Sequence, residues 1–61
     1  MNPQLQDLEN FAAHNGLTFR RSGAKHYYFL NKKGVRCSFI YELETWHELL
    51  NSGAITREIQ W

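Results

Sequence analysis

The chain has 61 residues, a formal net charge of +1 and one cysteine. A chain of this length forms a single domain, residues 1–61, which buries only about 60% of its unfolded surface. One cysteine excludes an internal disulfide, and no paired cysteine or histidine spacing predicts a metal site. We therefore expect no metal and no cofactor. The lack of a long apolar run predicts no membrane span, and a single thiol without a signal peptide predicts a cytoplasmic protein.

The charges are unevenly distributed along the chain. Residues 18–36 contain no acidic residue and hold the basic side chains Arg20, Arg21, Lys25, Lys32, Lys33 and Arg36. Residues 42–48 hold three glutamates. The near-neutral total argues against a dedicated duplex-binding domain, because such a domain needs many cations to neutralise phosphates. We expect one basic and one acidic end, which are either a binding feature or two solvated faces of opposite sign.

The first expected element is a helix that begins at Pro3 and is ended by Gly16. Asn2 is a suitable N-cap, and proline suits the first helical position because no amide partner is needed there. The apolar stripe of this helix consists of Leu5, Leu8, Phe11 and Ala12. Glycine can adopt the left-handed conformation that ends a helix, which lets Leu17 fold back onto the stripe.

Three antiparallel strands are expected next, at residues 17–21, 26–30 and 35–41. Residues 31–34 suit a type I turn followed by a glycine bulge, which places Asn31 opposite Val35. The face expected to meet the helices then carries Tyr27, Phe29, Val35, Cys37, Phe39 and Tyr41. The open face carries His26, Tyr28, Leu30, Arg36, Ser38 and Ile40. A slip by one residue would exchange the two faces.

A second helix is expected to start near Thr45, because Thr45 and Glu48 have the spacing of a capping box. Gly53 is expected to end it. Residues 54–61 alternate apolar and polar side chains, which favours a fourth strand. The four-residue spacing of Ile55 and Ile59 also permits a helical turn, so both alternatives remain at this point.

The predicted order is therefore α-β-β-β-α, an α+β fold in which two helices cover one face of an antiparallel sheet. This layout resembles that of double-stranded-RNA-binding domains. The expected core brings together Phe11, Phe29, Phe39 and Leu50. Cys37 is expected to be a small buried apolar residue.

The element order and two local segments resemble the HicA-type toxins, which are small ribonucleases of toxin–antitoxin pairs. The family carries a Gly-Ser-His motif at the start of its second strand, and the matching segment here is Ser22-Gly23-Ala24-Lys25-His26-Tyr27-Tyr28-Phe29, without the serine before the histidine. The family's closing segment is similar to Ser52-Gly53-Ala54-Ile55-Thr56-Arg57-Glu58-Ile59. The resemblance implies that His26 is a catalytic histidine. It would accept a ribose 2′-hydroxyl proton while Lys25 or Arg36 stabilises the phosphorane.

The residues themselves form no coherent active-site set, so the leading prediction is a non-catalytic interaction protein. We expect it to dock through its open sheet face and basic loops onto a protein, with RNA as the alternative partner. The expected binding residues are Arg20, Lys25, His26, Tyr28, Lys32, Lys33 and Arg36. Tyrosine and arginine anchor protein interfaces, and they also stack on bases and contact phosphates. In size and style the chain resembles phage or mobile-element inhibitors of host machinery, anti-CRISPR proteins among them.

Overall fold

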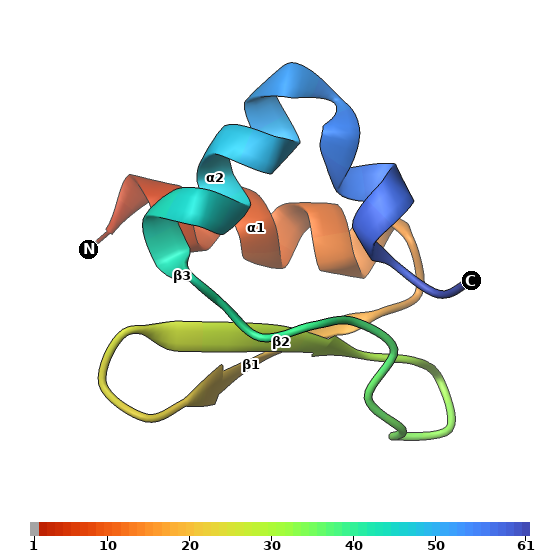
Figure 1. The fold of residues 1–61 in the computed structure, drawn as a ribbon. Helices are drawn as coiled ribbons and strands as arrows, with labels where there is room; N and C mark the ends of the chain where they lie inside the picture. Colours follow the sequence, from red (N-terminus) through yellow and green to blue (C-terminus); the bar gives the residue numbers. More distant parts are fainter. Residues whose placement is uncertain (1) are drawn as a thin grey trace.

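The computed structural model describes residues 2–61. Its elements are α1 (Pro3–His14), β1 (Thr18–Ser22), β2 (His26–Leu30), β3 (Tyr41–Glu42), α2 (Leu43–Ser52) and the short 3-10 helix η1 (Ala54–Glu58). The strands form one antiparallel sheet in the order β1-β2-β3. Both helices lie on one face of this sheet, and the other face is uncovered (Figure 1). The structure confirms the α+β class and the α-β-β-β-α order.

Both ends of α1 follow the local signals of the sequence. The Asn2 side chain accepts a hydrogen bond from the Gln4 amide at 3.0 Å. At the other end Gly16 has φ 68°, which a residue with a Cβ rarely adopts. The Leu17 amide donates to the Ala12 carbonyl at 2.8 Å, so the chain turns back and enters β1 beside the helix.

The turn between β2 and the next segment has the predicted geometry. The Asn31 amide donates to the Val35 carbonyl at 2.8 Å, and the Gly34 amide donates to the Asn31 carbonyl at 2.9 Å. The Asn31 side chain also accepts the Lys33 and Val35 amides. Gly34 has φ 77°, which is the left-handed conformation required at the bulge position.

Gly34→Val is expected to destabilise the domain by roughly 1–2 kcal/mol. A Cβ at this position would meet nothing within 4 Å, so the loss comes from backbone strain alone. Gly34→Asn is the matched control, since asparagine tolerates positive φ better than valine does. Urea unfolding of the two variants measures the difference, and equal stabilities would contradict the strained turn.

The third strand is much shorter than predicted, and this changes the core. Leu30 bridges Arg36, so a continuous ladder would place Phe39 opposite Tyr27; instead Tyr27 pairs with Tyr41. Two extra residues are thus accommodated in a bulge at residues 38–40. An even number keeps the alternation of faces, so Tyr41 still faces the helices.

The bulge overturns the prediction that Phe39 lies in the core. Its side chain is 69% exposed, and Val35, also predicted to face the helices, is 58% exposed. A side chain replaces a ladder bond at the bulge, because the Phe29 amide donates to the Ser38 hydroxyl at 2.9 Å. The Tyr27 carbonyl, next to the bulge, accepts the Trp46 indole N–H at 2.8 Å. Because these backbone groups keep partners, the bulge is a satisfied conformation.

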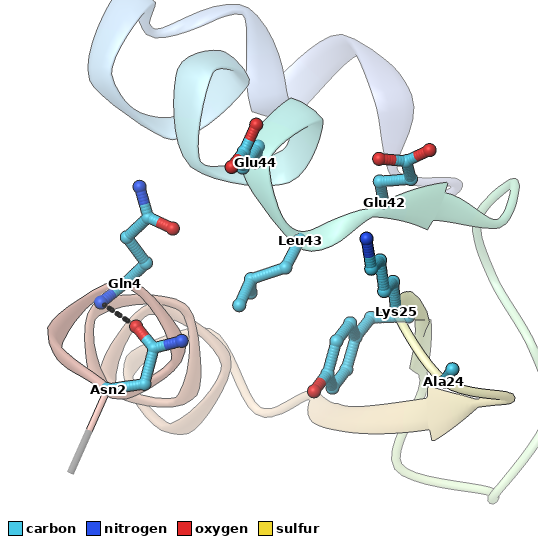
Figure 2. A pocket seen from close by; sticks show the side chains of 8 residues that line it. Asn2, Gln4, Ala24, Lys25, Glu42, Leu43 and Glu44 are labelled. Atoms are coloured by element: carbon cyan, nitrogen blue, oxygen red, sulfur yellow. Dashed lines mark hydrogen bonds between the residues drawn. The ribbon is translucent and has the colours of Figure 1, made fainter.

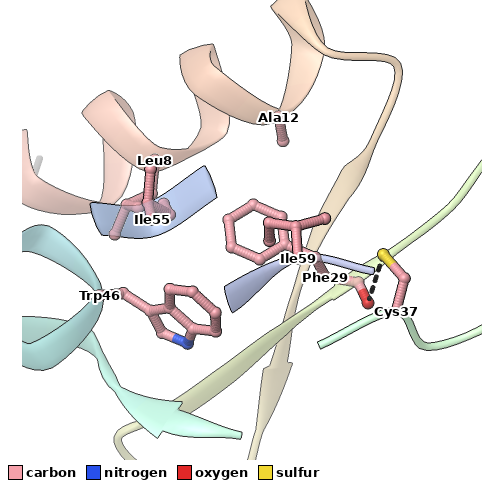
Figure 3. Packing of buried hydrophobic residues seen from close by; sticks show 7 residues of the cluster. All are labelled: Leu8, Ala12, Phe29, Cys37, Trp46, Ile55 and Ile59. Carbon is pink, nitrogen blue, oxygen red and sulfur yellow. Dashed lines mark hydrogen bonds between the residues drawn. The ribbon is translucent and has the colours of Figure 1, made fainter. Parts of the chain in front are cut away.

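The core lies between the helices and β2 (Figure 3). Its buried members are Leu8, Ala12, Phe29, Cys37, Trp46, Ile55 and Ile59. The Phe29 ring meets the Trp46 ring edge-on, with centroids 4.9 Å apart. Phe11 and Leu50 pack against this cluster and are partly buried, so three of the four predicted core residues do come together. Burial raises the pKa of the Cys37 thiol, which keeps it in the neutral form expected of a packing residue.

The second helix and the tail correct two further expectations. Helix α2 begins at Leu43 after Glu42, which forms no side-chain cap, so the capping box predicted at Thr45 is wrong. Gly53 ends the helix with φ 83°, as predicted. The fourth strand favoured for residues 54–61 is wrong over Ala54–Glu58, which form a 3-10 helix that buries Ile55. Ile59 then makes a single antiparallel bridge to Ser38.

Candidate binding surface

The uncovered face of the sheet is defined by the alternation of side chains along β2. Phe29 is buried under the helices, so its neighbours Tyr28 and Leu30 point to the opposite face. Tyr28 pairs with Arg20 across to β1. The register therefore places on this open face the side chains of Thr18, Arg20, Ser22, His26, Tyr28, Leu30, Arg36 and Glu42.

The open face has an apolar centre with charged ends. Tyr28 and Leu30 are half-buried, while Arg20 and Arg36 are exposed. Glu42 is the acidic residue among the side chains of this face. A central tyrosine between arginines is typical of a protein-docking surface, where desolvated aromatic and arginine side chains supply most of the binding energy.

Four of the seven predicted binding residues share this face: Arg20, His26, Tyr28 and Arg36. The structure separates the three lysines from them. Lys32 and Lys33 lie in the turn after β2, and the Lys32 side chain passes over Gly16 at the end of α1. The Lys32 ammonium near this helix end interacts favourably with the negative C-terminal end of the α1 dipole, so Lys32 has a structural role.

Lys25 lines a pocket at the end of the sheet, beside the starts of both helices (Figure 2). The pocket lies where the first turns of α1 and α2 approach the β1–β2 turn, and it is lined by Asn2, Gln4, Ala24, Lys25, Tyr27, Glu42, Leu43 and Glu44. The Lys25 carbonyl accepts the Leu43 amide at 3.0 Å, so this turn is attached to the start of α2. Because two glutamates share the pocket with one lysine, it does not favour an anion.

His26 is exposed at the first residue of β2 and lies between its cross-strand partners Ser22 and Glu42. Lys25 and Arg36, the cations expected to stabilise the phosphorane in a ribonuclease, do not lie beside His26 on this face. Arg36 pairs with Leu30, four residues along β2 and hence about 13 Å away at the usual strand rise. Lys25 lies at the pocket described above. The geometry thus surrounds His26 with a hydroxyl and a carboxylate.

The bulge creates a second surface feature, a pocket that the sequence did not indicate. A pocket of about 250 Å³ lies between the bulge and the end of η1 and is lined by Arg36, Ser38, Phe39, Arg57, Glu58 and Gln60. We call it the bulge pocket. Its two sides are held together by the Ser38–Ile59 bridge and by the Gln60 amide, which donates to the Cys37 carbonyl at 2.7 Å. Arg57 and Phe39 come together only through this tertiary contact, so no local pattern could have predicted them as a pair.

Two further side-chain contacts join separate elements of the fold. His47 Nε2 of α2 lies within hydrogen-bond distance of Asp7 Oδ2 of α1, at 2.9 Å. The Tyr41 hydroxyl donates to Glu58 at 2.6 Å, and this bond raises the pKa of the Tyr41 hydroxyl above its ordinary value. In the described part of the chain, no three His, Cys, Asp or Glu side chains gather to hold a metal ion. None of the helices described there has the length and apolar character of a membrane span.

Comparisons with protein-family models, with curated proteins and with solved structures find no match for this chain. Function is therefore inferred from the two surfaces.

Proposed function

We propose that this chain is a non-catalytic interaction protein that binds a protein partner through the open sheet face. The observation that carries the proposal is the uncovered face itself, with Tyr28 at its centre beside Arg20. Docking onto a partner blocks that partner's surface without any chemistry. This mode of action suits an inhibitor of the kind carried by phages or mobile elements, the anti-CRISPR or other anti-defence class.

A protein suits this face better than RNA does. Nucleic-acid affinity depends on neutralising several phosphates, and this face offers Arg20 and Arg36 with Glu42 opposing them. In a protein interface a few charges are enough to orient the partner, and buried aromatic groups supply most of the affinity. The half-buried Tyr28 fits that second role.

Tyr28→Ala and Arg36→Glu are each expected to weaken capture of a protein partner about tenfold or more. The immobilised chain is incubated with a cell lysate, before and after nuclease treatment, and bound proteins are quantified. Lys33→Ala is the matched control, because Lys33 lies exposed in the turn away from this face. His26 lies at one end of this face, so His26→Ala should weaken capture less than Tyr28→Ala does.

The ribonuclease alternative gives the opposite pattern in the same set of variants. Expression of the chain would then arrest growth, His26→Ala would abolish the arrest, and Tyr28→Ala would have little effect. Capture of RNA with no protein partner would also overturn the proposal, in favour of an RNA-binding module.

A further inference from the structure

Large apolar side chains are exposed along residues 35–40. The large hydrophobic residues exposed in the described chain are Val35, Phe39, Ile40 and Trp61. Three of them belong to residues 35–40, and of these Phe39 lines the bulge pocket. Trp61 lines a different hollow, beside Asn15 and Lys32. Phe39 therefore offers a partner in the bulge pocket an apolar contact.

Glu58 and Ser38 of the bulge pocket already have hydrogen-bond partners, whereas its arginines form no ion pair within the described chain. The Glu58 carboxylate accepts the Tyr41 hydroxyl, and the Ser38 hydroxyl accepts the Phe29 amide and donates to the Phe39 carbonyl. In contrast, no ion pair among residues 2–61 involves Arg36 or Arg57, and both residues line the pocket. The groups left to bind a partner are therefore two cations and the exposed ring of Phe39.

The size of the pocket limits what can occupy it. Cofactor and drug-like ligand sites usually span about 300–1,000 Å³, whereas this pocket has about 250 Å³ and is open to solvent along the bulge. Such a volume accepts one side chain of a larger partner. Carboxylates beside that side chain would be positioned to meet the arginines, which bind carboxylates through two parallel hydrogen bonds.

We propose that the bulge pocket binds an acidic segment of a protein, with one apolar side chain against Phe39 and flanking carboxylates on Arg36 and Arg57. Charge complementarity favours this occupant over a symmetric dimer of the chain, because a symmetric contact would bring the same arginines together. It also favours a peptide over RNA, because two arginines neutralise too few phosphates to hold a nucleic acid. This site lies at the sheet edge beside η1, so it extends beyond the open face on which the proposed function rests.

The test uses a short synthetic peptide with one central leucine between aspartates, added to the isotope-labelled full chain and followed by amide NMR shifts. We expect saturable shifts at residues 36–40 and 57–60 below about 1 mM peptide. Replacing the aspartates with asparagines should weaken binding at least about tenfold, and Arg57→Glu should do the same. Phe39→Ala, an exposed site that should leave the fold intact, should weaken binding several-fold.

Several results would overturn the proposal. These are the absence of shifts up to about 1 mM peptide, equal binding of the asparagine peptide, and shifts confined to Arg20 and Tyr28. An oligouridylate RNA that shifts the same amides at lower concentration would assign the pocket to nucleic acid instead. Tyr28→Ala is the control that separates the two proposals. It should leave peptide binding at the bulge pocket unchanged even where it abolishes capture through the open face.

Discussion

Phe29→Ala is expected to unfold most of the protein at room temperature. Phe29 is fully buried, and its ring lies 4.9 Å from the rings of both Phe19 and Trp46 and 5.8 Å from that of Phe11. Removing a buried phenylalanine side chain costs about 3–5 kcal/mol, which combines lost transfer free energy and an unfilled cavity. A single core in a chain of this size supplies only about 3–5 kcal/mol in total, so little stability would remain.

Phe39→Ala is the matched control, because it makes the same chemical change ten residues along the chain. Its side chain is 69% exposed, so the free energy of unfolding should change by no more than about 0.5 kcal/mol. Urea unfolding followed by the fluorescence of the buried Trp46 measures both variants. If Phe39→Ala were as destabilising as Phe29→Ala, the bulge would be absent and a continuous third strand would be present.

The parts of the fold that sequence predicts well are those specified by neighbouring residues. Asn2 and Gly16 define the two ends of α1 through contacts with residues a few positions away. Asn31 and Gly34 define the turn after β2 in the same local way. The side chains of β2 alternate between the faces as its composition indicates. The resulting register correctly placed Tyr28 and Arg36 on the uncovered face, away from Phe29.

The bulge could not be predicted, because its cause lies in distant parts of the chain. Alternation over residues 35–41 favours a continuous strand with Phe39 inside. In the folded protein Tyr41 takes the place opposite Tyr27 that Phe39 would hold in a continuous ladder. Trp46 packs its ring on Phe29 and Tyr41 and donates its indole N–H to the Tyr27 carbonyl. Tertiary packing by a larger aromatic residue thus overrides the local strand preference.

The tail follows the same logic. Its alternating pattern predicts a strand, yet Ala54–Glu58 turn in a 3-10 helix that buries Ile55, and Ile59 follows in extended backbone that bridges Ser38. The bulge pocket depends on both departures, since Phe39 comes from one and Arg57 from the other. Because the pocket needs both the bulge and the 3-10 helix, no pattern in the sequence indicates it.

Ser38→Ala is expected to destabilise the domain by roughly 1–3 kcal/mol, although it removes a single oxygen atom. The Ser38 hydroxyl accepts the Phe29 amide at 2.9 Å, in place of a ladder carbonyl. Phe29 is in the core, so its amide would lose its partner where water has little access. The Phe29 amide should therefore exchange with solvent deuterium much faster in the variant.

Ser22→Ala is the control for Ser38→Ala, because Ser22 also lies on a strand but its hydroxyl has no hydrogen bond among the described residues. Its stability should stay within about 0.5 kcal/mol of the parent chain. Equal stabilities of the two alanine variants, with unchanged exchange at Phe29, would show that the bulge does not depend on the hydroxyl. A selective loss in Ser38→Ala would instead show that one side chain holds the bulge open and so keeps Phe39 at the surface, where the proposed partner would meet it.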